Sequence, residues 1–168
     1  EKKKTEADAF NVAIGASAGA TMSSGSNNVL LGTSAGQRMT TAIKNVVVGN
    51  AALDHLVDAD FNVAVGHNAL TADTYGSGST AIGYQALQTQ NFTTAATSFN
   101  TAVGFEAGKV VSTGQSNSLI GYQAGVALTT GFANTVLGSA ALSTEDTGRY
   151  NTAIGASALE TLNSDVDS

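Results

Sequence analysis

The stretch from Ser79 to Leu87, STAIGYQAL, is one of nine copies of a motif close to Asn-x-Ala-Ile-Gly-x-x-Ala-Leu, and this motif decides the fold. The copies start at Asn11, Asn28, Asn45, Asn62, Ser79, Asn100, Asn117, Asn134 and Asn151. The spacing is 17 residues each time except once, where it is 21. A fixed period with one structural unit per copy predicts a solenoid, in which each repeat contacts mainly its neighbours. Such a rod has no central pocket, and this argues against an enzyme.

The first five positions of each repeat, numbered from its Asn as position 1, predict a short strand. Position 4 is always Ile, Leu or Val, and an invariant Gly at position 5 closes the run. Side chains alternate along a strand, so positions 2 and 4 face one way and position 3 the other. In the first four copies position 2 is Val, which makes both faces apolar and predicts burial on both sides. The coil covers one face, and we expect other copies of the chain to cover the second.

A second strand is predicted at positions 8 to 13, before a polar turn that often contains Gly. Position 12 within it is often apolar, as in Met22, Met39, Leu56, Val111, Leu128 and Leu162. The invariant Gly and Ala at positions 5 and 8 indicate a narrow interior. Ala-rich stretches such as 51–56 allow a turn of helix, but the fixed Gly and frequent Thr, Ser and Asn disfavour long helices.

The predicted fold class is therefore all-β, a parallel β-roll or β-solenoid of nine coils. We expect residues 1–9 to form a non-repeating head or linker and residues 10–168 to form the repeat array. An insertion near 88–99 accounts for the one longer repeat.

Composition narrows the classes of function. The net charge is -6 and charged residues make up 12% of the chain. The basic residues outside the Lys2–Lys4 run are scattered and form no basic stripe, so we expect no nucleic-acid binding. The absence of Cys excludes disulfides and Cys-ligated metals. No apolar stretch approaches the ~20 residues that span a bilayer, so we expect no membrane insertion by this segment.

The sequence offers no catalytic or metal-binding pattern. His55 lies near three Asp residues in a spacing that matches no known ligand set, and we interpret it and His67 as solvated surface residues. The adjacent acids Glu145 and Asp146 precede a turn and are predicted to be exposed. No nucleophile motif, P-loop or calcium-binding nonapeptide is present. We therefore predict no catalytic residue, metal or cofactor, and no enzymatic activity.

The recurring Asn at position 1 predicts a structural ladder. Stacked side-chain amides can hydrogen-bond along the rod and cap its turns. The ladder would comprise Asn11, Asn28, Asn45, Asn62, Asn100, Asn117, Asn134 and Asn151. A ligand role would require exposed amides, which an interior ladder does not offer.

Aromatic residues occupy position 6 in three consecutive repeats, as Tyr84, Phe105 and Tyr122. Stacked coils would align them in one stripe, with Gln85 and Gln123 beside it at position 7. One interpretation is a ring ladder that stabilises the stack. The other is a glycan-binding patch, because aromatic faces beside amides suit sugar rings and because the insertion lies in the same stretch. Both interpretations remain open from the sequence.

The run Asn100-Thr-Ala-Val-Gly and the stretches 79–87 and 151–159 resemble two related groups of proteins. One is the head repeat of trimeric autotransporter adhesins, and the other is the Asn-Thr-Ala-Ile-Gly-Tyr-Gln-Ala-Leu repeat of phage tail-fibre-like proteins. The resemblance covers residues 10 to about 162, and the 17-residue period is longer than that of most adhesin heads. The tail-fibre group is the closer match. Either resemblance implies a homotrimer of left-handed parallel β-rolls around a threefold axis.

The function expected from these observations is that of a structural and adhesive trimeric fibre segment. The first candidate is a phage tail fibre that takes part in host-surface attachment, and the alternative is the head of a bacterial surface adhesin. Both are extracellular, on a virion or a cell surface, and both would meet a surface glycan or protein receptor. An ice-binding solenoid is a remote alternative, because the Thr row at position 2 is replaced by Val in the first four copies. A left-handed β-helix acyltransferase is equally remote, since it needs three hexapeptides per coil and only one occurs here.

Overall fold

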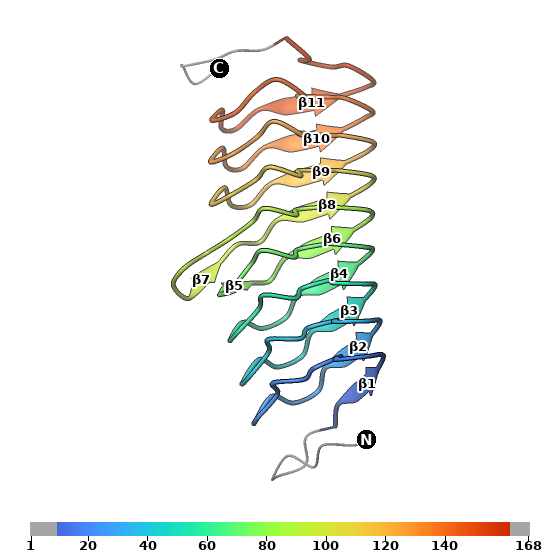
Figure 1. The fold of residues 1–168 in the computed structure, drawn as a ribbon. Helices are drawn as coiled ribbons and strands as arrows, with labels where there is room; N and C mark the ends of the chain where they lie inside the picture. Colours follow the sequence, from blue (N-terminus) through green and yellow to red (C-terminus); the bar gives the residue numbers. More distant parts are fainter. Residues whose placement is uncertain (1–9, 162–168) are drawn as a thin grey trace.

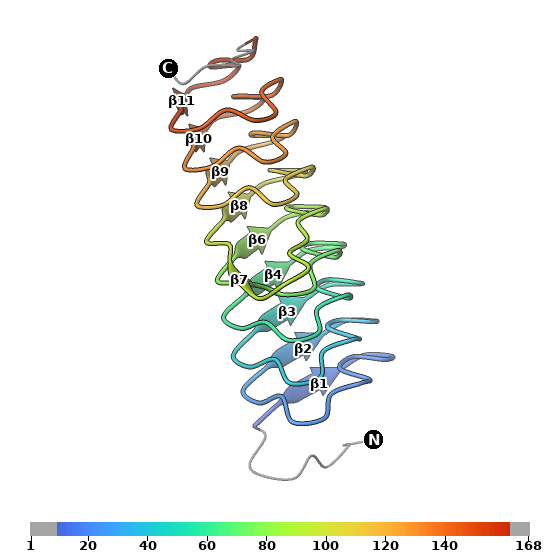
Figure 2. The same ribbon diagram turned by 90° about the vertical axis from the view of Figure 1, so that its left-hand side faces the viewer.

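The chain forms a parallel β-solenoid in the computed structural model, which describes residues 10–161. Nine strands stack into one sheet, separated by about eight complete turns, and no helix occurs in this range (Figures 1 and 2). The strands are β1 (Val12–Ile14), β2 (Val29–Leu31), β3 (Val46–Val48), β4 (Val63–Val65), β6 (Thr80–Ile82), β8 (Thr101–Val103), β9 (Ser118–Ile120), β10 (Thr135–Leu137) and β11 (Thr152–Ile154). The predicted head at 1–9 and the end of the array at 162–168 lie outside the described residues.

The register of the sheet follows the sequence repeat. Each strand residue pairs with its equivalent in the next coil, as Val29 does with Val46. The register also holds across the long repeat, where Thr80 pairs with Thr101. The extra residues bulge out with a small two-stranded sheet, β5 (Gly76–Ser77) and β7 (Ala96–Thr97), on the side away from the main sheet (Figure 1). The insertion therefore leaves the stack undisturbed.

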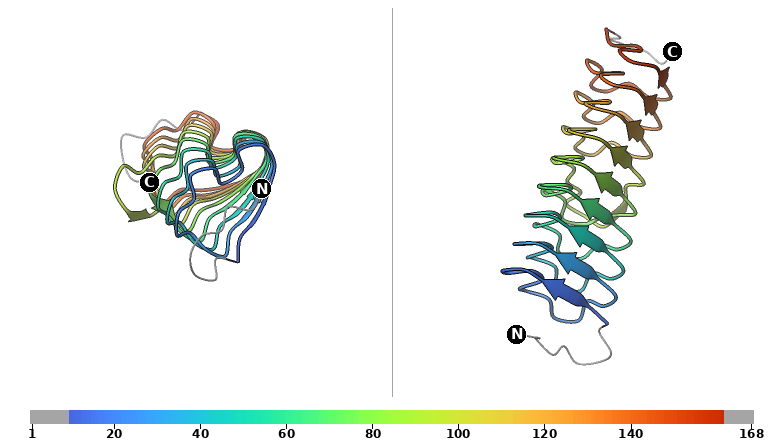
Figure 3. Two further views of the ribbon diagram at one scale, coloured as in Figure 1. Left: turned by 60° about the horizontal axis from the view of Figure 1, so that its bottom comes forward. Right: turned by 90° about the vertical axis from the view of Figure 1, so that its right-hand side faces the viewer.

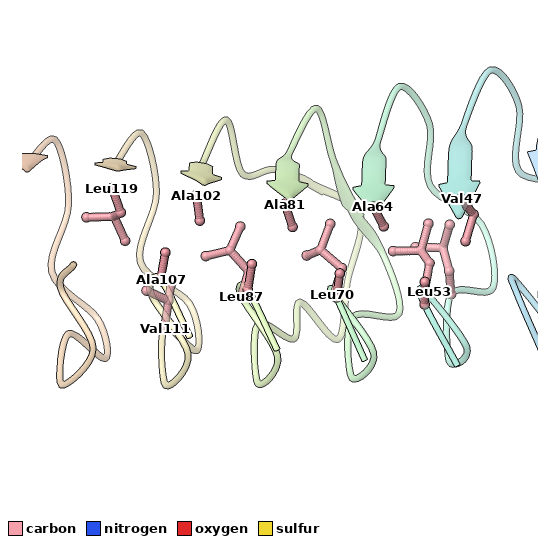
Figure 4. Close-up of a cluster of buried hydrophobic side chains, with 14 of the residues drawn as sticks. Val47, Leu53, Ala64, Leu70, Ala81, Leu87, Ala102, Ala107, Val111 and Leu119 are labelled. Atoms are coloured by element: carbon pink, nitrogen blue, oxygen red, sulfur yellow. The ribbon is translucent and has the colours of Figure 1, made fainter. Parts of the chain in front are cut away.

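Position 3 of each strand points into the coil, and positions 2 and 4 point outward, as the alternation predicted. Position 3 is fully buried in the inner coils, and Figure 4 shows these side chains directed at the opposite wall of the coil. The invariant Ala at position 8 is buried too, which confirms the narrow interior. Large side chains on one side of the coil face small residues on the other. Leu119 on β9 faces Gly125, where an added Cβ would lie 2.9 Å from the Leu side chain.

The predicted second strand at positions 8 to 13 is wrong, because this segment is a chain of turns. Gly36 and Leu53, at position 9 of the second and third coils, have φ of +55° and +51°, which an extended strand does not allow. Alternate amides close turns onto the carbonyl three residues back, as from Met39 to Gly36. The amides between them donate to the next coil, as from Gly36 to the carbonyl of Ala52 at 3.0 Å. Viewed along the rod, these turns form a second wall opposite the sheet (Figure 3).

Candidate functional site

The position 1 asparagines form the predicted ladder inside the solenoid. The Oδ1 of Asn117 accepts hydrogen bonds from the backbone N–H and the Nδ2 of Asn134 at 3.1 and 3.0 Å. Its Nδ2 donates to the carbonyl of Gly131 at 2.9 Å, across its own coil. The position 1 asparagines from Asn11 to Asn134 each brace one coil internally and join it to the next in the same way. From Asn28 to Asn151 these side chains are at most 4% exposed, so no external ligand can reach them.

The ladder is interrupted at Ser79, whose side chain is too short to continue it. Gln90, from the opposite wall of the same coil, supplies the missing acceptor: its Oε1 accepts from Asn100 Nδ2 at 2.8 Å. The hydroxyl of Ser79 instead lies 2.6 Å from the hydroxyl of Ser98, at the far end of the insertion. The Asn-to-Ser change and the insertion are therefore parts of one hydrogen-bonded arrangement.

A buried carboxylate anchors this arrangement. Asp73 is fully buried, and its Oδ2 accepts from Gln90 Nε2 at 2.5 Å. Its Oδ1 accepts from the backbone N–H groups of Gly76 and Phe92 at 3.0 and 3.2 Å. Burial raises the pKa of Asp73 above its ordinary value of 3.8, although these hydrogen bonds act in the opposite direction. This site was not predicted from the sequence; its signal was a polar residue at position 12, where six of the nine repeats carry an apolar one.

Asp73 gives a pH dependence of known sign. The pKa of Asp73 is higher in the folded than in the unfolded chain. Above this raised pKa the buried carboxylate is charged, and its burial lowers the free energy of unfolding. As the pH falls through the raised pKa towards 3.8, Asp73 takes up a proton in the folded chain and this loss of stability disappears. We expect Asp73→Asn to remove this part of the profile in urea unfolding measured at a series of pH values. Glu106→Gln is the control of opposite sign, since hydrogen bonds from Lys109 and Gln123 lower the pKa of Glu106, so that its contribution is lost on acidification. If the free energy of unfolding changed with pH in the same way for the wild type and Asp73→Asn, this assignment would be contradicted.

The prediction that Glu145 is exposed is wrong. This residue also occupies position 12, points into the coil and is 1% exposed. Its Oε1 accepts from the backbone N–H groups of Thr147 and Gly148 at 3.2 and 2.7 Å, so the carboxylate caps the following turn. Within residues 10–161 no cluster of three or more His, Cys, Asp or Glu side chains could hold a metal ion.

The aromatic stripe is present and is longer than predicted. Tyr84 stacks on Phe105 with centroids 5.0 Å apart, and Phe105 stacks on Tyr122 at 5.5 Å. His67 extends the stripe by stacking on Tyr84 at 5.6 Å, a role that the sequence analysis missed. We call His67, Tyr84, Phe105 and Tyr122 the aromatic stripe. The planes of neighbouring rings lie within 15° of each other, so both faces of Tyr84 and Phe105 are covered and these two rings turn their edges to solvent.

The two Gln residues beside the stripe differ in the contacts that hold them. Gln123 donates from Nε2 to Glu106 Oε2 at 2.8 Å, and Lys109 donates to Glu106 Oε1 at 2.7 Å. Gln85 donates its backbone N–H to the carbonyl of His67 at 3.0 Å. A sugar would find covered ring faces at the centre of the stripe and an amide already engaged by Glu106. The glycan patch stays a prediction, and the geometry favours the ring ladder.

Exposed apolar side chains gather on the outer side of the nine-stranded sheet. We call positions 2 and 4, together with the bordering position 6 and the residue directly before position 1 of each repeat, the outer face. This last residue is position 17 of the preceding repeat, except for Phe10 before the first repeat and Phe99 at the end of the long one, and we call the whole row position 17. Within residues 10–161, every exposed large hydrophobic side chain except Leu159 lies on it: Phe10, Val12, Ile14, Val29, Leu31, Val46, Phe61, Ile82, Tyr84, Phe99, Phe105, Ile120, Tyr122, Leu137, Tyr150 and Ile154. Lys44 is the one charged residue at these positions in the described coils, and its ammonium group lies over the ring of Phe61.

Comparison with known proteins gives no match to a family model, a curated protein or a solved structure. Among the described residues no helix is long and apolar enough to cross a membrane. The function is therefore argued from the rod, its outer face and its stripe.

Proposed function

We propose that the chain is a structural and adhesive segment of a homotrimeric fibre. The observation that carries the proposal is the outer face, whose position 4 is apolar in every described coil and which holds a single charged residue, Lys44. Monomeric soluble proteins rarely leave a contiguous apolar patch of more than a few hundred Å² exposed. A face of this kind along a rod is typical of a surface that is covered in the working assembly.

The partner that fits this face best is another copy of the same chain. Position 4 is Ile, Leu or Val in all nine repeats, and its side chains form a row along the sheet. Two copies of one solenoid have the same coil spacing, so such a row finds an apolar neighbour at every coil. Few charges lose water on contact, because the face holds only Lys44. Hydrophobic burial at about 25 cal/mol per Å² then favours association.

The number of copies and the biological setting are proposed from the sequence resemblance. It implies three left-handed rolls around a threefold axis, in an extracellular phage tail fibre that contributes to host-surface attachment or, as the alternative, in a bacterial surface adhesin. A trimer would present any receptor contact three times and gain avidity without new contacts. We propose no catalytic activity for this segment.

Charge on the outer face is expected to dissociate the trimer. Ile82 and Ile120 are exposed position 4 residues of β6 and β9, so Ile82→Asp with Ile120→Asp would require a carboxylate from each strand to lose water in the interface. Native mass spectrometry should show three chains for the wild type and one for this double variant, with unchanged circular dichroism. Thr93→Asp with Thr94→Asp, on the exposed tip of the insertion, is the matched control and should remain trimeric. A monomeric wild type would refute the proposal.

A further inference from the structure

Two rows of side chains border the outer face on opposite sides. Position 6 follows the closing Gly of each strand and carries the aromatic stripe. Position 17 precedes the Asn of each strand and carries exposed aromatic residues, among them Phe61 and Phe99. The whole strand lies between the two rows of one coil, so within one chain they do not meet.

The two rows are complementary in size at several levels of the rod. Tyr122 at position 6 of the seventh coil corresponds to Ser116 at position 17, and Tyr84 of the fifth coil corresponds to Gly78. The relation is reversed at the ends, where Ala16 faces the level of Phe10, and Ala156 that of Tyr150.

Beside β4 and β8 both rows carry large residues: His67 and Phe61 flank β4, and Phe105 and Phe99 flank β8. Phe99 leans towards the level of the fifth coil, where an added Cβ on Gly78 would lie 2.9 Å from its ring. At these levels the stripe offers ring edges, and an edge packs favourably against the face of another ring. The position 17 row of a second chain, with Phe61 and Phe99 exposed, supplies such rings.

We propose that neighbouring copies lie parallel and in register, with the position 6 row of one copy packed against the position 17 row of the next. The inference rests on the proposed fibre and specifies its contact. A parallel arrangement also keeps the Val residues at position 2 of the first four coils together, apart from the Thr and Ser of the last five. An antiparallel arrangement sets each row against itself, so that Tyr84 and Tyr122 lose their small partners Gly78 and Ser116 and Val at position 2 meets Thr. The contact is heterologous, and a heterologous contact without a shift along the rod generates a closed ring when the rotation between copies closes.

Cysteine pairs test this contact directly, since the chain contains no Cys. We choose Ser116→Cys with Tyr122→Cys, because both residues are exposed and flank the same strand, β9. After mild oxidation, non-reducing electrophoresis should show most chains of the double variant in covalent species of two and three chains. Each single variant should remain at the mass of one chain. Ser116→Cys with Ala156→Cys, two coils out of register, is the matched control and should cross-link several-fold less.

The outcomes separate this inference from the proposed function. A wild type that is monomeric by native mass spectrometry overturns both. A native oligomer whose Ser116→Cys/Tyr122→Cys variant stays uncross-linked, or in which Tyr122→Cys alone links two chains, overturns the parallel contact and leaves the fibre proposal intact. Tyr84→Ala with Tyr122→Ala should weaken the oligomer, and an oligomer of unchanged stability would overturn the placement of the stripe between copies.

Discussion

Replacing Gly104 by alanine is expected to lower the free energy of unfolding by about 4 kcal/mol, from backbone strain and overpacking together. Gly104 has φ of +143°, a conformation that alanine adopts poorly, and an added Cβ would lie 2.2 Å from the carbonyl oxygen of Gly121. That oxygen belongs to the equivalent Gly of the next coil, so the clash is with backbone and no side chain can move aside. Urea unfolding followed by circular dichroism measures the loss.

The last described coil offers a matched control for this substitution. Gly155 occupies the same position 5 and also has positive φ, at +119°, but a Cβ there would meet no atom within 4 Å. Gly155→Ala should therefore retain only the backbone strain, about 1–3 kcal/mol. Equal losses for the two variants would show that the close stacking of coils does not determine the need for Gly at position 5.

Asn117→Ala is expected to lower the free energy of unfolding by about 2–6 kcal/mol, because two buried backbone groups lose their partners at about 1–3 kcal/mol each. The carbonyl of Gly131 loses its donor and the N–H of Asn134 loses its acceptor. Asn117→Asp should be more damaging still. A carboxylate can accept from Asn134, but it places a buried charge against the oxygens of Gly131 and Asn100. The same urea titration measures both variants.

Asn50→Ala is the control for the ladder. Asn50 occupies the exposed position 6 of the third coil, so its truncation should change stability by less than about 0.5 kcal/mol. If Asn117→Ala were as mild as Asn50→Ala, the ladder would contribute nothing to the rod that its backbone does not already supply.

The parts of the fold that could be predicted are those that depend only on the repeat. A motif that returns every 17 residues places equivalent residues on neighbouring coils, which gives the parallel register, the inward position 3 and the Asn ladder. The turns at positions 8 to 13 could not be read in this way. Leu53 and Leu70 at position 9 adopt positive φ, and nothing in an apolar β-permissive side chain signals this conformation.

The polar sites at position 12 could not be predicted from the sequence for a different reason. Asp73, Gln90 and Glu145 replace apolar residues inside the coil, and their partners are backbone N–H groups or residues of the insertion. Only the folded distances show that Gln90 reaches the place left by Ser79. The aromatic stripe was predictable because position 6 repeats, whereas the covering of its ring faces required the orientation of the side chains.

Because the strand register continues unbroken across the long repeat, the length of the rod and the loop that it exposes are independent of each other. Four additional residues enter between Ser79 and Asn100, yet β6 and β8 pair as any other neighbours do. The number of coils therefore determines the length of the rod, whereas the bulge determines which residues are exposed at one level of it. Thr93, Thr94 and Ala95 at the tip are exposed, so foreign peptides could be grafted there without changing the length of the scaffold.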